Sequence, residues 1–227
     1  MAPVVRIALG GVNCYLLTAG DGLVLVDTGT PEKRASLESQ LANAGCGPGR
    51  LRLIVITHGD YDHAGNAVYL REKYGAPIAM HAGDVPRVER GDWRLGFKPK
   101  PDKFSFVFRE VSRFIRLGDF EVFEPDIHLE DGQSLAEFGL DATVLHMPGH
   151  TSGSLGILTG DTELVCGDLL DGVGTPSLHF FIDDMTAARA SLDRLKTLAV
   201  QTVYPGHGKP FLLDRVRDPR RLSEADE

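Results

Sequence analysis

Residues 58–63 read His-Gly-Asp-Tyr-Asp-His, and this run follows the apolar stretch Leu-Arg-Leu-Ile-Val-Ile at 51–56. The run places four candidate metal ligands at the end of a predicted strand: His58, Asp60, Asp62 and His63. Unpaired charges beside a core are costly, whereas capping the helix that follows needs one carboxylate and no histidine. The cluster therefore indicates a divalent cation rather than a polar loop that only begins a helix.

Length and composition predict one globular domain over residues 1–227. The 227 residues are 42% hydrophobic, which is enough for one substantial core. The formal net charge of −8 is unlike the basic surface of nucleic-acid-binding proteins. We therefore expect no nucleic-acid partner.

The cysteines and the apolar stretches predict a cytoplasmic location. Cys14, Cys46 and Cys166 are odd in number and far apart, unlike a disulfide framework or a paired-cysteine zinc site. Residues 1–6 lack the apolar core of a signal peptide, and no apolar stretch is long enough to span a bilayer. We expect a protein of the reducing cytoplasm without a membrane partner.

The N-terminal third alternates predicted strands with predicted helices. Strands are expected at 13–17, 23–26, 51–56 and 78–80, and helices at 30–44 and from about 62 to 74. Thr30 is expected to cap the first helix with Pro31 at its first position, and Gly45 and Gly75 to end the two helices. The pattern is typical of a β-α-β-α-β unit.

The C-terminal part has the same mixture of elements. Strands are expected at 142–146, 154–158, 163–166 and 202–204. A helix starting at Asp183 or Asp184 would bury Ala188, Leu192 and Leu195 on one stripe. Strands outnumber helices, and the helices fall between groups of strands, which predicts an α/β structure whose helices cover sheet faces.

Segment 84–123 departs from this alternation and is predicted to be a lid or an insert. It holds eight aromatic residues, and residues 87–116 contain nine Lys or Arg against four Asp or Glu. Phe104, Phe106 and Phe108 would share one face of a strand. As a lid, its positive charge would attract an anionic substrate. A hydrophobic subcluster with a solvated rim and a homodimer interface are the alternatives.

Three later residues extend the metal hypothesis. His150, Asp168 and His207 each follow a predicted strand and stand beside glycine, where a chain turns sharply at the edge of a sheet. Each alone is typical of a structural residue. As a set with the 58–63 run, they indicate ligands that converge although they are distant in sequence.

The ordered set formed by Asp27, the 58–63 run, His150, Asp168 and His207 resembles the metallo-β-lactamase superfamily across essentially the whole chain. The resemblance implies an αββα sandwich, in which two mixed β-sheets are flanked by helices, with a two-metal site at the edge of the sheets. It implies a small-molecule substrate.

The resemblance also implies a role for each matched residue. It assigns His58 and His150 to a first metal, with Asp60 where a histidine is usual. It assigns Asp62, His63 and His207 to a second metal, with Asp168 as the bridge and Asp27 as a buried residue that orients ligands.

The implied activity is hydrolysis by a metal-bound hydroxide, which two divalent cations make available at neutral pH. Zinc is the first expectation. Iron and manganese are alternatives because the oxygen ligand of Asp60 suits harder metals. Asp62 is the candidate catalytic residue, handling the proton of the nucleophile with the oxygen that does not ligate. The expected substrate is a small ester, thioester, lactone or phosphoester.

Departures from the pattern narrow the expected activity. Asp168 stands where the best-known zinc β-lactamases have cysteine, so antibiotic hydrolysis is not the expected native role. The sequence has no segment after His207 long enough for the helical domain of glyoxalase II enzymes. An iron-dependent oxidoreductase and a noncatalytic sensor on the same fold are the alternative functions.

The remaining histidines match no ligand position: His81, His128, His146 and His179. Core or surface positions are expected for them, although His179 lies between two ligand motifs and could face the site. Cys166 is expected to be a small buried residue of a strand.

Overall fold

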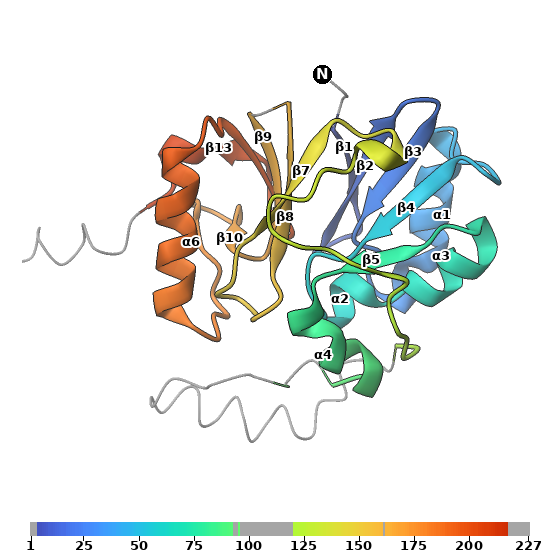
Figure 1. The fold of residues 1–227 in the computed structure, drawn as a ribbon, viewed down its shortest axis with the longest axis horizontal. Helices are drawn as coiled ribbons and strands as arrows, with labels where there is room; N and C mark the ends of the chain where they lie inside the picture. The colour runs from blue at the N-terminus through green and yellow to red at the C-terminus, as the bar shows by residue number, and fades with distance from the viewer. Residues whose placement is uncertain (1–3, 93–94, 96–119, 161, 218–227) are drawn as a thin grey trace, which may run out of the picture.

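In the computed structural model, residues 4–92, 95, 120–160 and 162–217 are described. They form two mixed β-sheets packed face to face, with helices on both outer faces (Figure 1). The αββα sandwich expected from the sequence is confirmed. The prediction of a single domain over residues 1–227 stays a prediction.

The first sheet has six strands in sequence order, β1 (Val4–Ala8), β2 (Asn13–Ala19), β3 (Gly22–Val26), β4 (Leu51–Val55), β5 (Ile78–Met80) and β6 (Ile127–His128). Strands β1 to β3 are antiparallel, and β3 to β6 are parallel. The chain therefore leaves β3, β4 and β5 at the same edge. This edge carries the metal motifs.

The second sheet has the order β13 (Phe211–Leu212), β12 (Thr202–Pro205), β9 (Glu163–Gly167), β8 (Leu155–Thr159) and β7 (Ala142–His146). Strands β9 and β12 run parallel, so Asp168 and His207, which follow them, leave the sheet at the same edge. A short hairpin of β10 (Leu170–Asp171) and β11 (Ser177–Leu178) follows β9.

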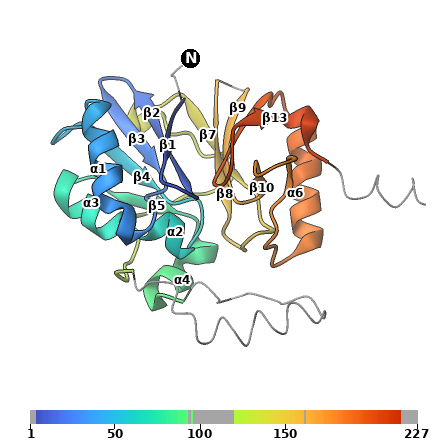
Figure 2. The same ribbon diagram turned by 180° about the vertical axis from the view of Figure 1, so that it is seen from behind.

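Helices cover the outer faces of both sheets, as Figures 1 and 2 show from opposite sides. On the side of the first sheet lie α1 (Arg34–Asn43), α2 (Tyr61–Ala64), α3 (Ala67–Tyr74) and α4 (Val85–Arg90). The second sheet is covered by α6 (Met185–Thr197). Short 3-10 turns are η1 (Pro31–Lys33), η2 (Ala82–Asp84), η3 (Ala136–Phe138) and η4 (Leu213–Arg215). None of the helices in the described ranges combines the length and apolar character needed to cross a bilayer.

The buried apolar residues form three layers. Leu17, Val55 and Val144 belong to the layer between the two sheets. Leu37 and Leu41 of α1 pack on the outer face of the first sheet. The expected stripe of α6, formed by Ala188, Leu192 and Leu195, is buried against the second sheet. The ligand loops are thereby held between two rigid faces.

The first two helices differ in detail from the prediction. The chain after Thr30 first forms η1, and the Thr30 side chain makes no capping hydrogen bond. The predicted 62–74 helix is two helices, because the chain bends at Gly65 and Asn66. A Cβ on Gly65 would lie 2.7 Å from the carbonyl oxygens of Gly29 and Tyr61, so the bend needs glycine.

Segment 84–123 is described only in part. Residues 84–92, 95 and 120–123 include α4, and Phe120 and Phe123 are buried in the core beside the first sheet. Those two rings match the hydrophobic-subcluster alternative. The other aromatic residues, including the predicted strand of Phe104, Phe106 and Phe108, lie outside the described residues, and the lid stays a prediction.

Candidate metal centre

The structure brings all seven predicted ligand side chains to one edge of the sandwich. His58 follows β4, Asp168 follows β9 and His207 follows β12. His150 lies beyond β7, in a loop whose Gly149 packs against the backbone of Ala188 in α6. The remaining three come from the loop and first turn of α2: Asp60, Asp62 and His63. Their assignment to particular metals stays a prediction.

One group of potential ligands consists of His58, His150 and Asp168, whose ligand atoms all lie within 4.8 Å of one another. Nε2 of His58 is 3.9 Å from Oδ2 of Asp168. Nε2 of His150 is 4.0 Å from the same oxygen. These spacings leave room for one cation at the centre of the group, and the three residues are among those predicted to hold the first metal or to bridge to it.

A second group consists of Asp62, His63 and His207, again with ligand atoms within 4.8 Å of one another. Nε2 of His207 is 3.4 Å from Oδ2 of Asp62 and 3.1 Å from Oδ2 of Asp168. Nε2 of His63 is 3.5 Å from Oδ1 of Asp168. Asp168 thus faces both groups, as a bridging ligand must.

Three buried polar atoms of the centre have no hydrogen-bond partner among the described residues: Nε2 of His58, Nε2 of His63 and Oδ1 of Asp168. Buried polar atoms are nearly always paired. Their orphaned state fits cations in contact with these atoms, because imidazole nitrogen and carboxylate oxygen are ordinary ligands of divalent metals.

The other ring nitrogen of each histidine is held by the protein. Nδ1 of His58 lies 2.9 Å from Oγ1 of Thr57, and Nδ1 of His63 lies 2.8 Å from Oδ2 of Asp27. Nδ1 of His150 lies 2.6 Å from the carbonyl oxygen of Phe181, and Nδ1 of His207 lies 2.8 Å from that of Gly11. Such contacts fix the ring so that Nε2 faces the centre, as is usual for metal-binding histidines.

Asp27 is the buried orienting residue that the sequence predicts. Its carboxylate accepts hydrogen bonds from N and Oγ1 of Thr57 and pairs with His63. Its φ of 63° is the only positive value at a non-glycine residue in the described part of the chain. A strained backbone of this kind persists where the surroundings require it, and it is common at functional sites.

The metal-free centre has strongly shifted pKa values. Burial lowers the pKa of His58, and the neighbouring His63 and His150 lower it further. Burial alone would raise the pKa of Asp168, but the charges of His63, His179 and His207 hold it well below its usual range. The neutral imidazole of His58 and the ionised carboxylate of Asp168 are the forms that bind a cation, whereas the pKa values of His150 and His207 are raised to about 9, so these two rings must first lose a proton.

Asp60 lies beside the first group. Its Oδ2 is 3.2 Å from Nε2 of His150 and 3.8 Å from Nε2 of His58, while its Oδ1 accepts a hydrogen bond of 2.9 Å from Arg87. Burial opposes ionisation, yet the hydrogen bond with His150 and the charges of His58, His150 and Arg87 lower its pKa. Its role as a ligand stays a prediction.

Three residues of the site are not among the predicted ligands. His179 lines the pocket, and its Nε2 lies 3.7 Å from Oδ2 of Asp168, so its position between two ligand motifs was a valid signal. Arg87 forms ion pairs with Asp60 and Asp183. The sequence contains no sign of this contact, because Arg87 and Asp183 are far apart along the chain. Asp183 is thus a residue of the pocket, and the N-cap of α6 is Asp184, whose side chain accepts hydrogen bonds from N of Thr186 and N of Ala187.

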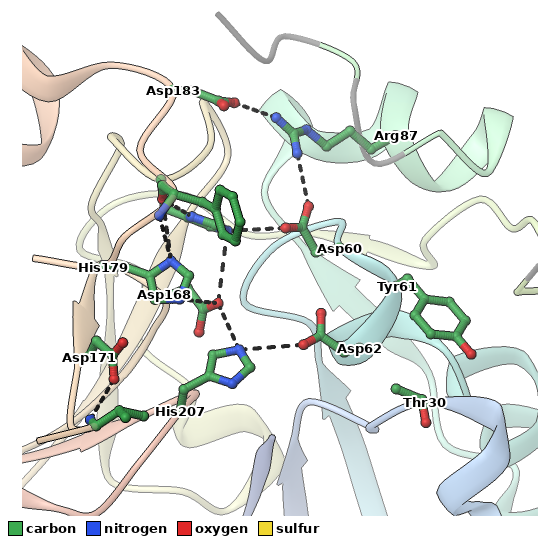
Figure 3. Close-up of a pocket in the computed structure, with 13 residues that line it drawn as sticks. Thr30, Asp60, Tyr61, Asp62, Arg87, Asp168, Asp171, His179, Asp183 and His207 are labelled. Carbon is green, nitrogen blue, oxygen red and sulfur yellow. Dashed lines mark hydrogen bonds and ion pairs between the residues drawn. The ribbon is translucent and has the colours of Figure 1, made fainter. Parts of the chain in front are cut away.

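The centre opens into a pocket of about 510 Å³, part of which Figure 3 shows. Among the described residues, one guanidinium, that of Arg87, and five carboxylates line it: Asp60, Asp62, Asp168, Asp171 and Asp183. With neutral histidines, two divalent cations would balance this excess of negative charge. Tyr61, Val173 and Phe181 add apolar wall.

Comparison with known proteins agrees with this geometry. The family model described as "Metallo-beta-lactamase superfamily" matches residues 7–207. A "Beta-lactamase-like protein 2 homolog" of Caenorhabditis elegans is 30% identical over 92% of this chain and 59% of its own length. A "Hydroxyacylglutathione hydrolase" of Anaeromyxobacter dehalogenans is 28% identical over 85% of this chain and 60% of its own length. The chain therefore spans about three fifths of these relatives.

A solved structure gives the same result. A metallo-beta-lactamase family protein from Thermus thermophilus superimposes with a TM-score of 0.70 and 25% identity, covering 99% of this chain and 77% of its own.

Proposed function

The chain belongs to the metallo-β-lactamase superfamily, and on that premise we propose that it is a dinuclear metal-dependent hydrolase of small esters or thioesters. One observation carries the proposal. Asp168 faces two groups of ligand side chains, and its buried Oδ1 and the Nε2 atoms of His58 and His63, which have no hydrogen-bond partner among the described residues, are suited to bind cations.

Under this proposal His58, His150 and Asp60 would hold the first cation, Asp62, His63 and His207 would hold the second, and Asp168 would contact both. We expect zinc, with iron or manganese as alternatives. When bound, two divalent cations supply an activated water and polarise the oxygen of the bond to be cleaved. The protein's own residues then orient the substrate and move protons.

Asp62 is the residue proposed to accept the proton of the attacking water. Its side chain is 34% exposed, whereas that of Asp168 is 4% exposed, so Asp62 is the carboxylate that water and substrate can reach. Its Oδ2 faces Nε2 of His207 at 3.4 Å, and its Oδ1 lies 4.0 Å from Nε2 of His63. One oxygen can ligate while the other accepts a proton.

Esters and thioesters are favoured over the other substrate classes for two reasons. Relatives of this chain are named hydroxyacylglutathione hydrolases, which is the name of a thioester hydrolase. The pocket also joins a polar floor to an apolar wall of Tyr61, Val173 and Phe181, which suits an acyl group. Lactones and phosphoesters remain candidate substrates and are included in the activity test described below. Attraction of an anionic substrate by segment 84–123 stays a prediction.

The proposed setting is the reducing cytoplasm. All three cysteines are buried free thiols. Secreted proteins of this size more often carry disulfides. The partner is a small-molecule substrate, and a homodimer stays a prediction.

The test is hydrolysis of chromogenic esters, thioesters, lactones and phosphodiesters by the purified chain with zinc or manganese added. We expect turnover of an ester or a thioester that a chelator abolishes. Asp62→Asn should lower kcat by about 10²- to 10⁴-fold, the usual contribution of a general base, without unfolding the protein. No metal-dependent turnover of any of these classes by the wild-type chain would contradict the proposal.

Asp60 favours a second candidate, an iron-dependent oxidoreductase. It adds a third carboxylate to a centre with four histidines, and oxygen ligands suit iron better than zinc. Protein purified without added metal would then contain iron, absorb visible light and consume oxygen. Zinc-containing, colourless protein that hydrolyses esters would eliminate this candidate.

A further inference from the structure

Arg87 is a buried cation beside the proposed metal centre. It lies on α4 and is 4% exposed. Figure 3 shows its guanidinium between two carboxylates from opposite halves of the sandwich, Asp60 before α2 and Asp183 before α6. A buried guanidinium is costly unless it is paired with carboxylates, and here two carboxylates pair with it.

The fold makes specific room for this arginine. A Cβ on Gly59 would lie 2.8 Å from Cβ of Arg87, so the glycine between His58 and Asp60 lets α4 approach the ligand loop. Asp84, just before α4, accepts hydrogen bonds from N of Gly59 and from N of Gly153. These bonds fix α4 to the loops that carry His58 and His150. Arg87 is therefore held in place rather than resting against the centre by chance.

The two carboxylate oxygens of Asp60 have different partners. Arg87 binds Oδ1 at 2.9 Å. The other oxygen, Oδ2, faces Nε2 of His150 at 3.2 Å and Nε2 of His58 at 3.8 Å. Only one oxygen of Asp60 is thus turned toward the first ligand group. An ion pair with the other oxygen fixes its direction.

The charges of the pair also cancel. Histidine is the usual residue at this position in the metallo-β-lactamase superfamily, and a neutral histidine would add no charge to the centre. Asp60 adds one negative charge, and Arg87 adds one positive charge. With Asp183, the other partner of Arg87, unchanged, Asp60 and Arg87 together keep the formal net charge of the centre equal to that with histidine at position 60 and a neutral residue at position 87, while an oxygen ligand would replace a nitrogen ligand.

We propose that Asp60 and Arg87 are a matched pair that together take the place of one histidine, with Arg87 positioning Asp60 as a single-oxygen ligand of the first metal. This inference rests on the metal centre of the proposed function. It makes Arg87 a positioning residue, and it makes the pair a determinant of metal preference: compared with histidine at position 60, the oxygen ligand should raise the affinity for iron or manganese relative to that for zinc.

The test is a double-mutant cycle on the full chain with Asp60→His, Arg87→Gln and both together. The glutamine introduced by Arg87→Gln can still hydrogen-bond to Asp183. Each variant is loaded with zinc or manganese, and affinity is measured by competition with a chromogenic chelator, with metal content by elemental analysis. Each single substitution should weaken the first site by about 10- to 100-fold. Asp60→His leaves Arg87 paired with Asp183 but beside a neutral ring that cannot accept its second ion pair, and Arg87→Gln removes the ion pair that orients Asp60.

The double variant should recover zinc affinity to near the wild-type value and lose manganese relative to zinc. Arg90→Gln, on an exposed position of the same helix, is the control and should change neither metal. If the double variant binds zinc more weakly than either single variant, as two independent defects would predict, the inference is overturned. If Arg87→Gln does not fold, the cycle is run with Arg87→Lys, which keeps the charge. Full affinity in Arg87→Lys combined with Asp60→His would equally overturn it.

The cycle separates this inference from the proposed function. A wild-type chain that binds no metal would refute both. A wild-type chain that binds two metals and hydrolyses esters, with variants whose defects simply add, would refute the pairing alone.

Discussion

Nδ1 of His63 lies 2.8 Å from Oδ2 of Asp27, and both side chains are buried. The same carboxylate accepts a hydrogen bond from Oγ1 of Thr57, which in turn contacts Nδ1 of His58. Asp27 therefore orients one histidine of each ligand group, directly for His63 and through Thr57 for His58. This shared contact links the two halves of the metal centre.

Asp27→Asn should weaken metal binding at both groups. Asparagine tolerates a positive φ, so the backbone at 27 should be retained while the carboxylate charge is lost. Loss of such a partner typically lowers metal affinity by about 10- to 100-fold. Chelator competition measures it. Asp21→Asn, in an exposed turn, is the control, and equal affinities in the two variants would show that Asp27 does not orient the ligands.

Gly206→Ala should disturb the centre more than the fold. A Cβ at 206 would lie 2.0 Å from Oδ1 of Asp168 and 2.7 Å from Cε1 of His63, so Asp168 must move. We expect loss of at least one metal ion per chain, measured by elemental analysis. Gly47→Ala is the matched control, because a Cβ there meets nothing within 4 Å. Full metal content in Gly206→Ala would mean that Asp168 does not ligate.

His179→Phe should lower activity and leave the metals in place. His179 lines the pocket and stacks on His207 with ring centroids 5.4 Å apart, and phenylalanine keeps that contact. We expect a ring nitrogen of His179 to contact a charged substrate or intermediate. Its loss should lower kcat/KM by about 10- to 100-fold, the value of one hydrogen bond to a charged group. Elemental analysis decides between this role and ligation with Asp168 and His207, since a lost ion would assign His179 to the metals.

Metal binding should release protons and strengthen with rising pH. Burial alone would lower the pKa of His150, but the hydrogen bond and charge of Asp60 and the charge of Asp168 raise it to about 9. Burial alone would also lower the pKa of His207, but the charge of Asp168 and the hydrogen bond with it raise that pKa to about 9.

Both imidazoles therefore hold a proton at pH 7 in the metal-free chain, and a cation must displace it. Affinity should rise with pH up to about 9 and level off above it. Calorimetry in buffers of different ionisation enthalpy counts the released protons, and binding with no proton release at pH 7 would show that these histidines do not ligate.

The sequence predicts most of the fold and of the ligand set for a physical reason. Each ligand motif follows a strand, and parallel strands end at the same edge of a sheet, so Asp168 and His207, which follow β9 and β12, could be placed together without knowledge of the coordinates. His58 follows β4 of the other sheet, and only the resemblance to the superfamily placed it beside them. Periodicity also located α6, whose buried stripe is the one expected.

The remainder depends on contacts between distant segments. Arg87 lies 27 residues from Asp60 and 96 from Asp183, and no local pattern distinguishes it from the other basic residues of 87–116. At the break between α2 and α3, Gly65 packs closely on Gly29 and Pro31, a tertiary contact that helical periodicity does not contain. Such contacts decide how the ligands are held, even where the ligands themselves are predictable.

The most direct test of the central claim is the number of metal ions per chain, measured by elemental analysis on protein purified without chelator and then dialysed against zinc-free or zinc-containing buffer. We expect two divalent ions per chain after zinc loading, falling toward one in Asp60→Ala and in His207→Ala. A wild-type chain that retains no metal after loading would contradict a two-metal centre formed by these seven side chains.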